Sequence, residues 1–222
     1  SATELTAALV TTGSLVVAGS ATLTFDDDPT GAQLAAINPK TSGTITLNST
    51  SQAFTGTATE LAAAFDGFGA NALSGAITIS AGTINTTQLK TISDATSGAI
   101  TLPSTNFTLS GTSSDLADAL SGNFSNYAGN VTLTDNPIHA QLATINAGTS
   151  GTITLNNNAV TFSGTAAYLS NAFAGGLVGT QTGAVTITDT SGTIAATTLS
   201  SIGEQTDGVV TAASGGITIS GS

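Results

Sequence analysis

Residues 32–47 read AQLAAINPKTSGTITL, and residues 140–155 read AQLATINAGTSGTITL. The likeness extends along the chain, because segments with the pattern apolar-Thr-apolar begin at Leu23, Ile77, Val131 and Val185, which are equally spaced. Self-similarity at a fixed period, here about 54 residues, is typical of proteins built from stacked repeats. The sequence therefore predicts one array over residues 1–222, with whole repeats at 23–76, 77–130 and 131–184 and partial repeats at 1–22 and 185–222.

Each repeat holds three predicted strands, and the apolar-Thr-apolar segment is the first of them. The second strand begins at Ile45, Ile100, Ile153 and Val210, and the third ends in Gly56, Gly111, Gly164 and Gly221. We expect the third strand to continue the second or to pair beside it. In the first strand, Val131 and Leu133 alternate with threonine, so one face is expected to be buried and the other to show hydroxyls.

Two short predicted helices separate the strands. Leu and Ile three residues apart, as in Leu34 and Ile37, fall on one face of a helix between the first and second strands. A hydroxyl residue followed three positions later by an acid, as in Thr57 and Glu60, resembles the capping box that starts a helix. A Thr-Ser-Gly stop follows the first helix at Gly43, Gly98 and Gly151. Glycine suits the position after a helix end, where φ is often positive.

The order strand, helix, strand, strand, helix and Gly-rich return predicts an α/β fold, a tandem-repeat solenoid of parallel strands with short helices. One unit alone cannot bury its apolar stripe, whereas stacked neighbours can. Isolated helices below ~12 residues are marginal, so an all-β solenoid is the alternative. Ser1 and Ser222 both occupy the position that follows the third strand. Such in-phase ends fit a piece of a longer array, or subunits that stack head to tail into a filament.

Stacked repeats are expected to place equivalent threonines in two ladders. One ladder holds Thr24, Thr78, Thr132 and Thr186, and the other holds Thr46, Thr101, Thr154 and Thr211. Neighbouring strands lie about 4.8 Å apart, so these ladders would form a flat, regular hydroxyl surface. Such a surface could bind ice or a polysaccharide. The alternative interpretation is that threonine serves only as a strand former and a solubilising residue.

Composition excludes several classes of partner. Only 7% of residues are charged, and 13 acidic residues against two lysines, with no arginine, give a net charge of -11. Nucleic acids and anionic membrane surfaces both need cationic groups, so neither is an expected partner. No apolar run reaches the ~18 residues of a membrane span. Cysteine is absent, which fits an intracellular protein or a bacterial surface protein, and the acidic, Lys-poor, Thr-rich balance favours an extracellular or cell-surface location.

Catalytic and metal-binding patterns are sparse. His139 is the single histidine, and neither a G-x-S-x-G elbow nor a P-loop occurs, so we expect no enzyme and no cofactor. Calcium is the one candidate ion, because Asp26, Asp27 and Asp28 begin an EF-hand-like loop, although Ile37 stands where the bidentate Glu belongs. Two further aspartates fall in the register of Asp27, namely Asp135 and Asp189. The alternative is a polar turn at the end of each first strand.

Residues 32–47 and the segment SGTAAYL at 163–169 resemble the tandem repeats of very large bacterial surface proteins, common in cyanobacterial and other marine bacterial sequences. The resemblance implies an extracellular array, such as an adhesin stalk, a surface-layer component or a matrix fibre, and supplies no catalytic residues. We therefore expect a non-catalytic structural protein whose partners are copies of itself, end to end, or neighbouring repeats of a longer chain. A polysaccharide or another surface is the alternative partner.

Overall fold

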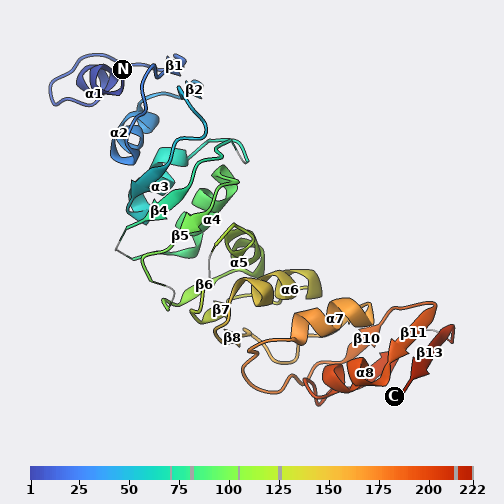
Figure 1. Cartoon of the computed structure of the whole chain (residues 1–222). Helices are drawn as coiled ribbons and strands as arrows, with labels where there is room; N and C mark the ends of the chain where they lie inside the picture. Colours follow the sequence, from blue (N-terminus) through green and yellow to red (C-terminus); the bar gives the residue numbers. More distant parts are fainter. Residues whose placement is uncertain (71, 81–82, 105, 125–126, 213–214, 222) are drawn as a thin grey trace. The chain divides into compact units, whose positions relative to one another are not determined.

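A computed structural model describes residues 1–70, 72–80, 83–104, 106–124, 127–212 and 215–221. These residues form a mixed α/β structure in which every pair of strands is parallel (Figure 1). The α/β class is confirmed and the all-β alternative is wrong. The chain divides into two compact units, Ser1–Ser104 with Gly122–Ser125 and Thr105–Ser121 with Asn126–Ser222. The single array over residues 1–222 stays a prediction.

The helices in the described residues are short. They are α1 (Ala2–Leu9), α2 (Gly31–Ile37), α3 (Ala58–Phe65), α4 (Thr86–Ala95), α5 (Ser113–Leu120), α6 (His139–Gly148), α7 (Ala166–Phe173) and α8 (Ala196–Gly203), with a 3-10 turn, η1 (Asn38–Lys40), after α2. None of the helices in this part of the chain is long and apolar enough to cross a membrane.

The strands fall into the three predicted types, with one addition. First strands are β1 (Leu23–Thr24), β4 (Ile77–Ile79), β7 (Val131–Leu133) and β10 (Val185–Ile187). Second strands are β2 (Ile45–Thr46), β5 (Ile100–Thr101), β8 (Ile153–Thr154) and β12 (Val210–Ala212). Third strands are β3 (Phe54–Gly56), β6 (Leu109–Gly111), β9 (Phe162–Gly164) and β13 (Ile217–Ser220), and β11 (Gly192–Ala195) is an extra strand before α8.

Side-chain caps start helices α1 to α5 and α7, as the capping pattern predicted, whereas the N-cap side chains of α6 and α8 make no such bond. The Thr57 hydroxyl accepts a hydrogen bond from Glu60 N at 3.2 Å, and Glu60 Oε2 accepts one from Thr57 N at 2.9 Å. These bonds from Thr57 hold the pKa of the Glu60 carboxyl below its usual value. Glutamine takes the place of the acid in α2, where Thr30 N donates to Gln33 Oε1 at 2.9 Å. The caps satisfy backbone N–H groups that a helix leaves without partners, which is why such short helices form.

Strand pairing differs from the prediction. Three of the four third strands, β3, β6 and β9, pair with the first strand of the next repeat, as Phe54 does with Ile77. The second strand lies on the other side of that first strand, as Ile100 does. The resulting sheets have the orders β3-β4-β5, β6-β7-β8 and β9-β10-β12. The third strand neither continues the second nor pairs beside it. In each of these sheets one helix lies between the third strand and the first strand, and another lies between the first strand and the second, as in the order β3, α3, β4, α4, β5.

The core lies between the sheets and the helices of each unit. The leucines and isoleucines predicted to share one helical face are all fully buried, namely Leu34, Ile37, Leu89, Ile92, Leu142 and Ile145. In the first strands, Ile77 and Ile79 are buried and Thr78 is exposed, so the predicted alternation is confirmed. Helices pack side by side within a unit, α2 against α3 and α6 against α7.

A threonine and a glycine join each second strand to the first strand beside it. Thr96 Oγ1 donates to Gly75 O at 3.1 Å and accepts from Gly98 N at 2.9 Å. Ser97 N adds a bond to Leu73 O at 3.0 Å. This Thr-x-Gly clamp recurs at Thr41 and Gly43, Thr149 and Gly151, and Thr206 and Gly208. The clamp fixes the separation of the two strands before their ladder begins.

The clamp glycines are needed for space. A Cβ at Gly98 would lie 2.2 Å from Gly75 O, and one at Gly151 would lie 2.3 Å from Gly129 O. None of the clamp glycines has a left-handed φ, so the predicted role as helix-ending residues with positive φ is wrong. The close approach of two backbones excludes any side chain at these positions.

Gly98→Ala should destabilise the protein by at least about 1–3 kcal/mol, because its Cβ collides with a backbone oxygen that cannot rotate away. Gly69→Ala is the matched control, since its Cβ would meet no atom within 4 Å, and it should change stability by less than about 0.5 kcal/mol. Urea unfolding followed by circular dichroism measures both. Equal stability of the two variants would contradict the close approach.

Candidate interaction surfaces

Exposed hydroxyls form short rows across each sheet. Thr78 lies between Thr55 and Thr101, so that one row crosses the sheet β3-β4-β5. The other rows are Thr24 with Thr46, Ser110 with Thr132 and Thr154, Ser163 with Thr186 and Thr211, and Thr193 with Thr218. Their side chains are exposed or half-exposed. Each row offers two or three hydroxyls on adjacent strands.

The prediction that equivalent threonines of successive repeats lie side by side in two ladders is wrong. Thr24 and Thr78 were expected to stack, together with Thr132 and Thr186, but these residues lie in four different sheets. Likewise Thr46, Thr101, Thr154 and Thr211 belong to separate sheets. The strand register instead places residues of the first set beside residues of the second set, as Thr78 lies beside Thr101. Each first strand pairs with the second strand that follows it in the sequence, and not with the first strand of the next repeat.

Three of the aspartates predicted as calcium candidates accept hydrogen bonds from helix N-termini. Asp27 Oδ1 accepts from Ala2 N at 2.7 Å, and Asp189 Oδ2 accepts from Ala166 N at 2.7 Å. Asp135 Oδ1 accepts from Ser113 N at 2.6 Å, and its other oxygen accepts from the Ser113 hydroxyl at 3.2 Å. Each N–H belongs to the first residue of α1, α7 or α5. A carboxylate at a helix N-terminus also gains from the helix dipole.

The other acidic candidates lie apart from this arrangement. Asp28 Oδ1 accepts from Asn48 Nδ2 at 3.3 Å, and Asp26 is exposed. Within the described ranges, no three His, Cys, Asp or Glu side chains lie close enough together to hold a metal ion. The capping role of the aspartates was missed in the sequence, although their recurrence just after a first strand, at the same register of the repeat, was a signal for it.

His139, the single histidine, begins helix α6 and is half-buried. Its ring packs on the ring of Tyr168 in α7, with centroids 5.8 Å apart. The imidazole therefore contributes to the contact between two neighbouring helices.

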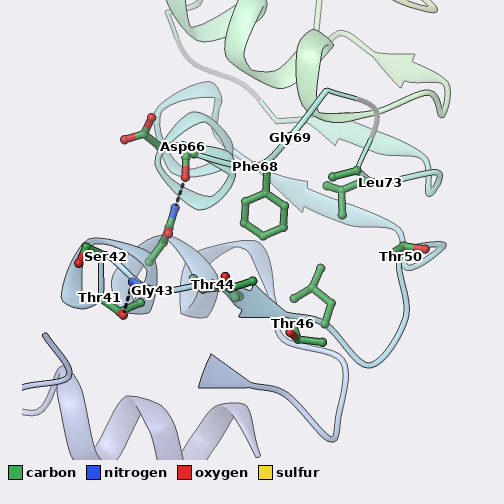
Figure 2. A pocket seen from close by; sticks show the side chains of 15 residues that line it. Thr41, Ser42, Gly43, Thr44, Thr46, Thr50, Asp66, Phe68, Gly69 and Leu73 are labelled. Atoms are coloured by element: carbon green, nitrogen blue, oxygen red, sulfur yellow. Dashed lines mark hydrogen bonds between the residues drawn. The ribbon is translucent and has the colours of Figure 1, made fainter. Parts of the chain in front are cut away.

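A cavity of about 540 Å³ opens in the unit formed by Ser1–Ser104 with Gly122–Ser125. Figure 2 shows the Phe68 ring projecting toward the segment that holds Thr44 and Thr46. Asp66, Gly69 and Leu73 are among the other residues that line the cavity. Asn38 Nδ2 donates to Asp66 O at 2.9 Å and holds one side of the opening. The cavity thus combines an aromatic ring with threonine residues, and Figure 2 shows the Asp66 carboxylate directed away from the Phe68 ring.

The cavity exists because the Gly-rich return differs between repeats. In the second repeat Ile100 N donates to Asn123 O at 2.9 Å, and in the third Ile153 N donates to Gly176 O at 2.7 Å. In the first repeat no described residue of the return bonds to Ile45 in this way, and Phe68 N donates to Phe65 O at 3.0 Å. The Phe68 ring packs on Phe65, with centroids 6.1 Å apart, and the edge of the second strand stays open.

Asp135→Ala should lower the stability by about 0.5–2 kcal/mol, because it removes the acceptor for the first N–H of α5. The loss should be the same in calcium and in a chelator, as measured by thermal unfolding. Asp26→Ala, at an exposed position, serves as the control and should have little effect in either buffer. A calcium-dependent gain in stability that Asp135→Ala abolishes would assign the carboxylate to a metal instead.

No family model matches the sequence, and the comparisons with curated proteins and with solved structures find no match. The resemblance to bacterial surface-protein repeats therefore stays a prediction drawn from the sequence alone.

Proposed function

We propose that this chain is a non-catalytic structural repeat protein of the cell surface or extracellular matrix. Its repeats stack into a parallel-strand solenoid that forms a rod or filament. The observation that carries the proposal is the Thr-x-Gly clamp, which recurs at Thr41, Thr96, Thr149 and Thr206 with the same two hydrogen bonds. A contact that recurs in the same form in every repeat supports a role that depends on the regular packing of those repeats.

The surface supports the same proposal. Lys90 pairs with Asp94 on α4 at 2.9 Å, and carboxylates such as Glu60 and Asp135 cap helices. The exposed rows across the sheets consist of hydroxyls, which are uncharged and stay hydrated without attracting charged partners. The acidic, lysine-poor and threonine-rich composition supports the extracellular location, and antibody labelling of intact source cells tests it.

A fusion of residues 1–221 directly to residues 1–222 keeps the repeat in phase and tests the stacking. Small-angle X-ray scattering should show a particle about twice as long with an unchanged cross-section. Its urea midpoint should also exceed that of the single chain, because each added repeat adds an interface. The same two copies joined by a flexible Gly-Ser linker provide the control. If both fusions scatter alike and unfold at the same urea concentration, the stacking proposal fails.

A binding surface for ice or a polysaccharide is the second candidate, favoured by the exposed hydroxyl rows and by the cavity beside Phe68. Ice or glycan binding through the rows should fall in the double variant Thr132→Leu, Thr154→Leu. Saccharide binding in the cavity should instead fall at least about tenfold in Phe68→Ala, since stacking on an aromatic ring contributes on the order of 1 kcal/mol or more. Thermal hysteresis and glycan titration measure these effects, and a parent protein inactive in both assays would end this candidate.

A further inference from the structure

First strands have partners on both sides in three of the four sheets that contain them. β4 is bonded to β3 through Phe54 N to Ala76 O at 3.0 Å and Ser80 N to Gly56 O at 2.7 Å. The same two bonds recur in the sheets of β7 and β10. β1 pairs with β2 alone, and among the described residues no strand covers its other edge. Thr22 O and Asp26 N, which match Ala76 O and Ser80 N, make no corresponding bond in this part of the chain.

β13 is a third strand without a first strand beside it. Its segment Thr218 to Gly221 matches Thr161 to Gly164, which pairs with β10. In the described residues β13 pairs only with β11, through Thr218 and Thr193. Ile219 is 57% exposed, whereas its counterparts Phe54, Leu109 and Phe162 are at most 3% exposed. The described residues therefore include a sheet edge at β1 with no third strand beside it, and a third strand, β13, with no first strand beside it.

We propose that β13 of one copy of this chain completes the β1-β2 sheet of a second copy. The register of the other sheets places Ile219 beside Leu23, Ser220 beside Thr24 and Gly221 beside Phe25. Ile219 N would donate to Thr22 O, and Asp26 N would donate to Gly221 O. The inference rests on the proposed structural function and specifies the contact through which such a protein associates with itself.

The neighbouring helices have matching exposed faces. Leu5 of α1 is half-exposed, whereas its counterparts Leu61, Leu116 and Leu169 are fully buried. Leu199 of α8 is also half-exposed, although the equivalent Leu142 is fully buried. α8 of one copy would therefore pack on α1 of the next, as α2 packs on α3 and α6 on α7.

The Gly-rich return supplies a third contact in the same docking. Leu15 and Val17, which are 95% and 87% exposed, lie in a return segment. In two other repeats the return lies on the second strand, Phe124 on Ile100 and Leu177 on Ile153. In the proposed contact the Leu15 segment would lie on β12 of the adjoining copy, beside Val209, which is 71% exposed. One arrangement of the two copies therefore buries the exposed strand, helix and return segment at the same contact. Because the contact joins two different surfaces of the chain, further copies can add at either end.

Disulfide trapping tests the register, because the chain has no cysteine of its own. Thr24→Cys and Ser220→Cys are made in separate chains with distinguishable tags and then mixed under mild oxidation. They should form a heterodimer, since paired strands bring their Cα atoms within the ~7 Å that a disulfide spans. Thr46→Cys with Ser220→Cys is the control, because Thr46 lies one strand further away, at about 9–10 Å. Equal yields from the two mixtures would overturn the inference.

Ile219→Asp tests the contact energetically, since Ile219 is exposed in the single chain and the substitution should not prevent folding. Sedimentation velocity of the full chain should show self-association that Ile219→Asp weakens at least about tenfold, because a carboxylate would be buried at the contact. Ile138→Asp, at a 61% exposed residue of the Thr105–Ser121, Asn126–Ser222 unit, should associate like the parent. The inference would be overturned if Ile219→Asp left the self-association unchanged, or if the parent chain stayed monomeric. The fused chains test the proposed structural function separately, because their copies are joined covalently.

Discussion

The close approach of two backbones at the Thr-x-Gly clamp is the constraint on which the rest of the structure depends. Strands of two or three residues provide few ladder hydrogen bonds, so the ladder alone cannot define the register. Thr96 binds the carbonyl of one strand and the N–H of the other, and Gly98 lets them meet without a side chain between them. Once this separation is set, Ile77 and Ile100 point to the same side and the helices can cover them.

Helix capping is the second device, and it links one segment to the next. The caps within a helix, such as Thr57 with Glu60, act over three residues. The aspartates act over a longer range, since Asp135 lies 22 residues from the N–H that it accepts. Six of the 13 acidic residues lie at helix N-termini in one of these two ways, namely Glu4, Asp27, Glu60, Asp115, Asp135 and Asp189. A carboxylate there gains from the helix dipole, so this part of the negative charge has a structural role.

Much of the secondary structure could be predicted from the sequence. The close spacing of Leu34 and Ile37 and the capping residues Thr57 and Glu60 are local signals, and the structure has helices at both places. Strand pairing was predicted less well, because the length of a repeat does not fix how far apart in the sequence two paired strands lie. The observed partners, such as Phe54 with Ile77, are separated along the chain by less than half a repeat and bear little sequence likeness. The cavity beside Phe68 could not be predicted, since it depends on how one return segment folds and not on a pattern of residues.

Parallel pairing at short intervals has a mechanical consequence. In the sheet β3-β4-β5, the chain leaves Phe54, forms helix α3, and returns at Ile77 to the neighbouring strand. Adjacent strands are only about 4.8 Å apart in space, whereas a fully extended segment of roughly 20 residues reaches about 70 Å. Tension that detaches one strand therefore releases a large reserve of length while the remaining pairs keep their hydrogen bonds. Such a protein would respond to load by lengthening in discrete steps, as an energy-absorbing tether, before any covalent bond is strained.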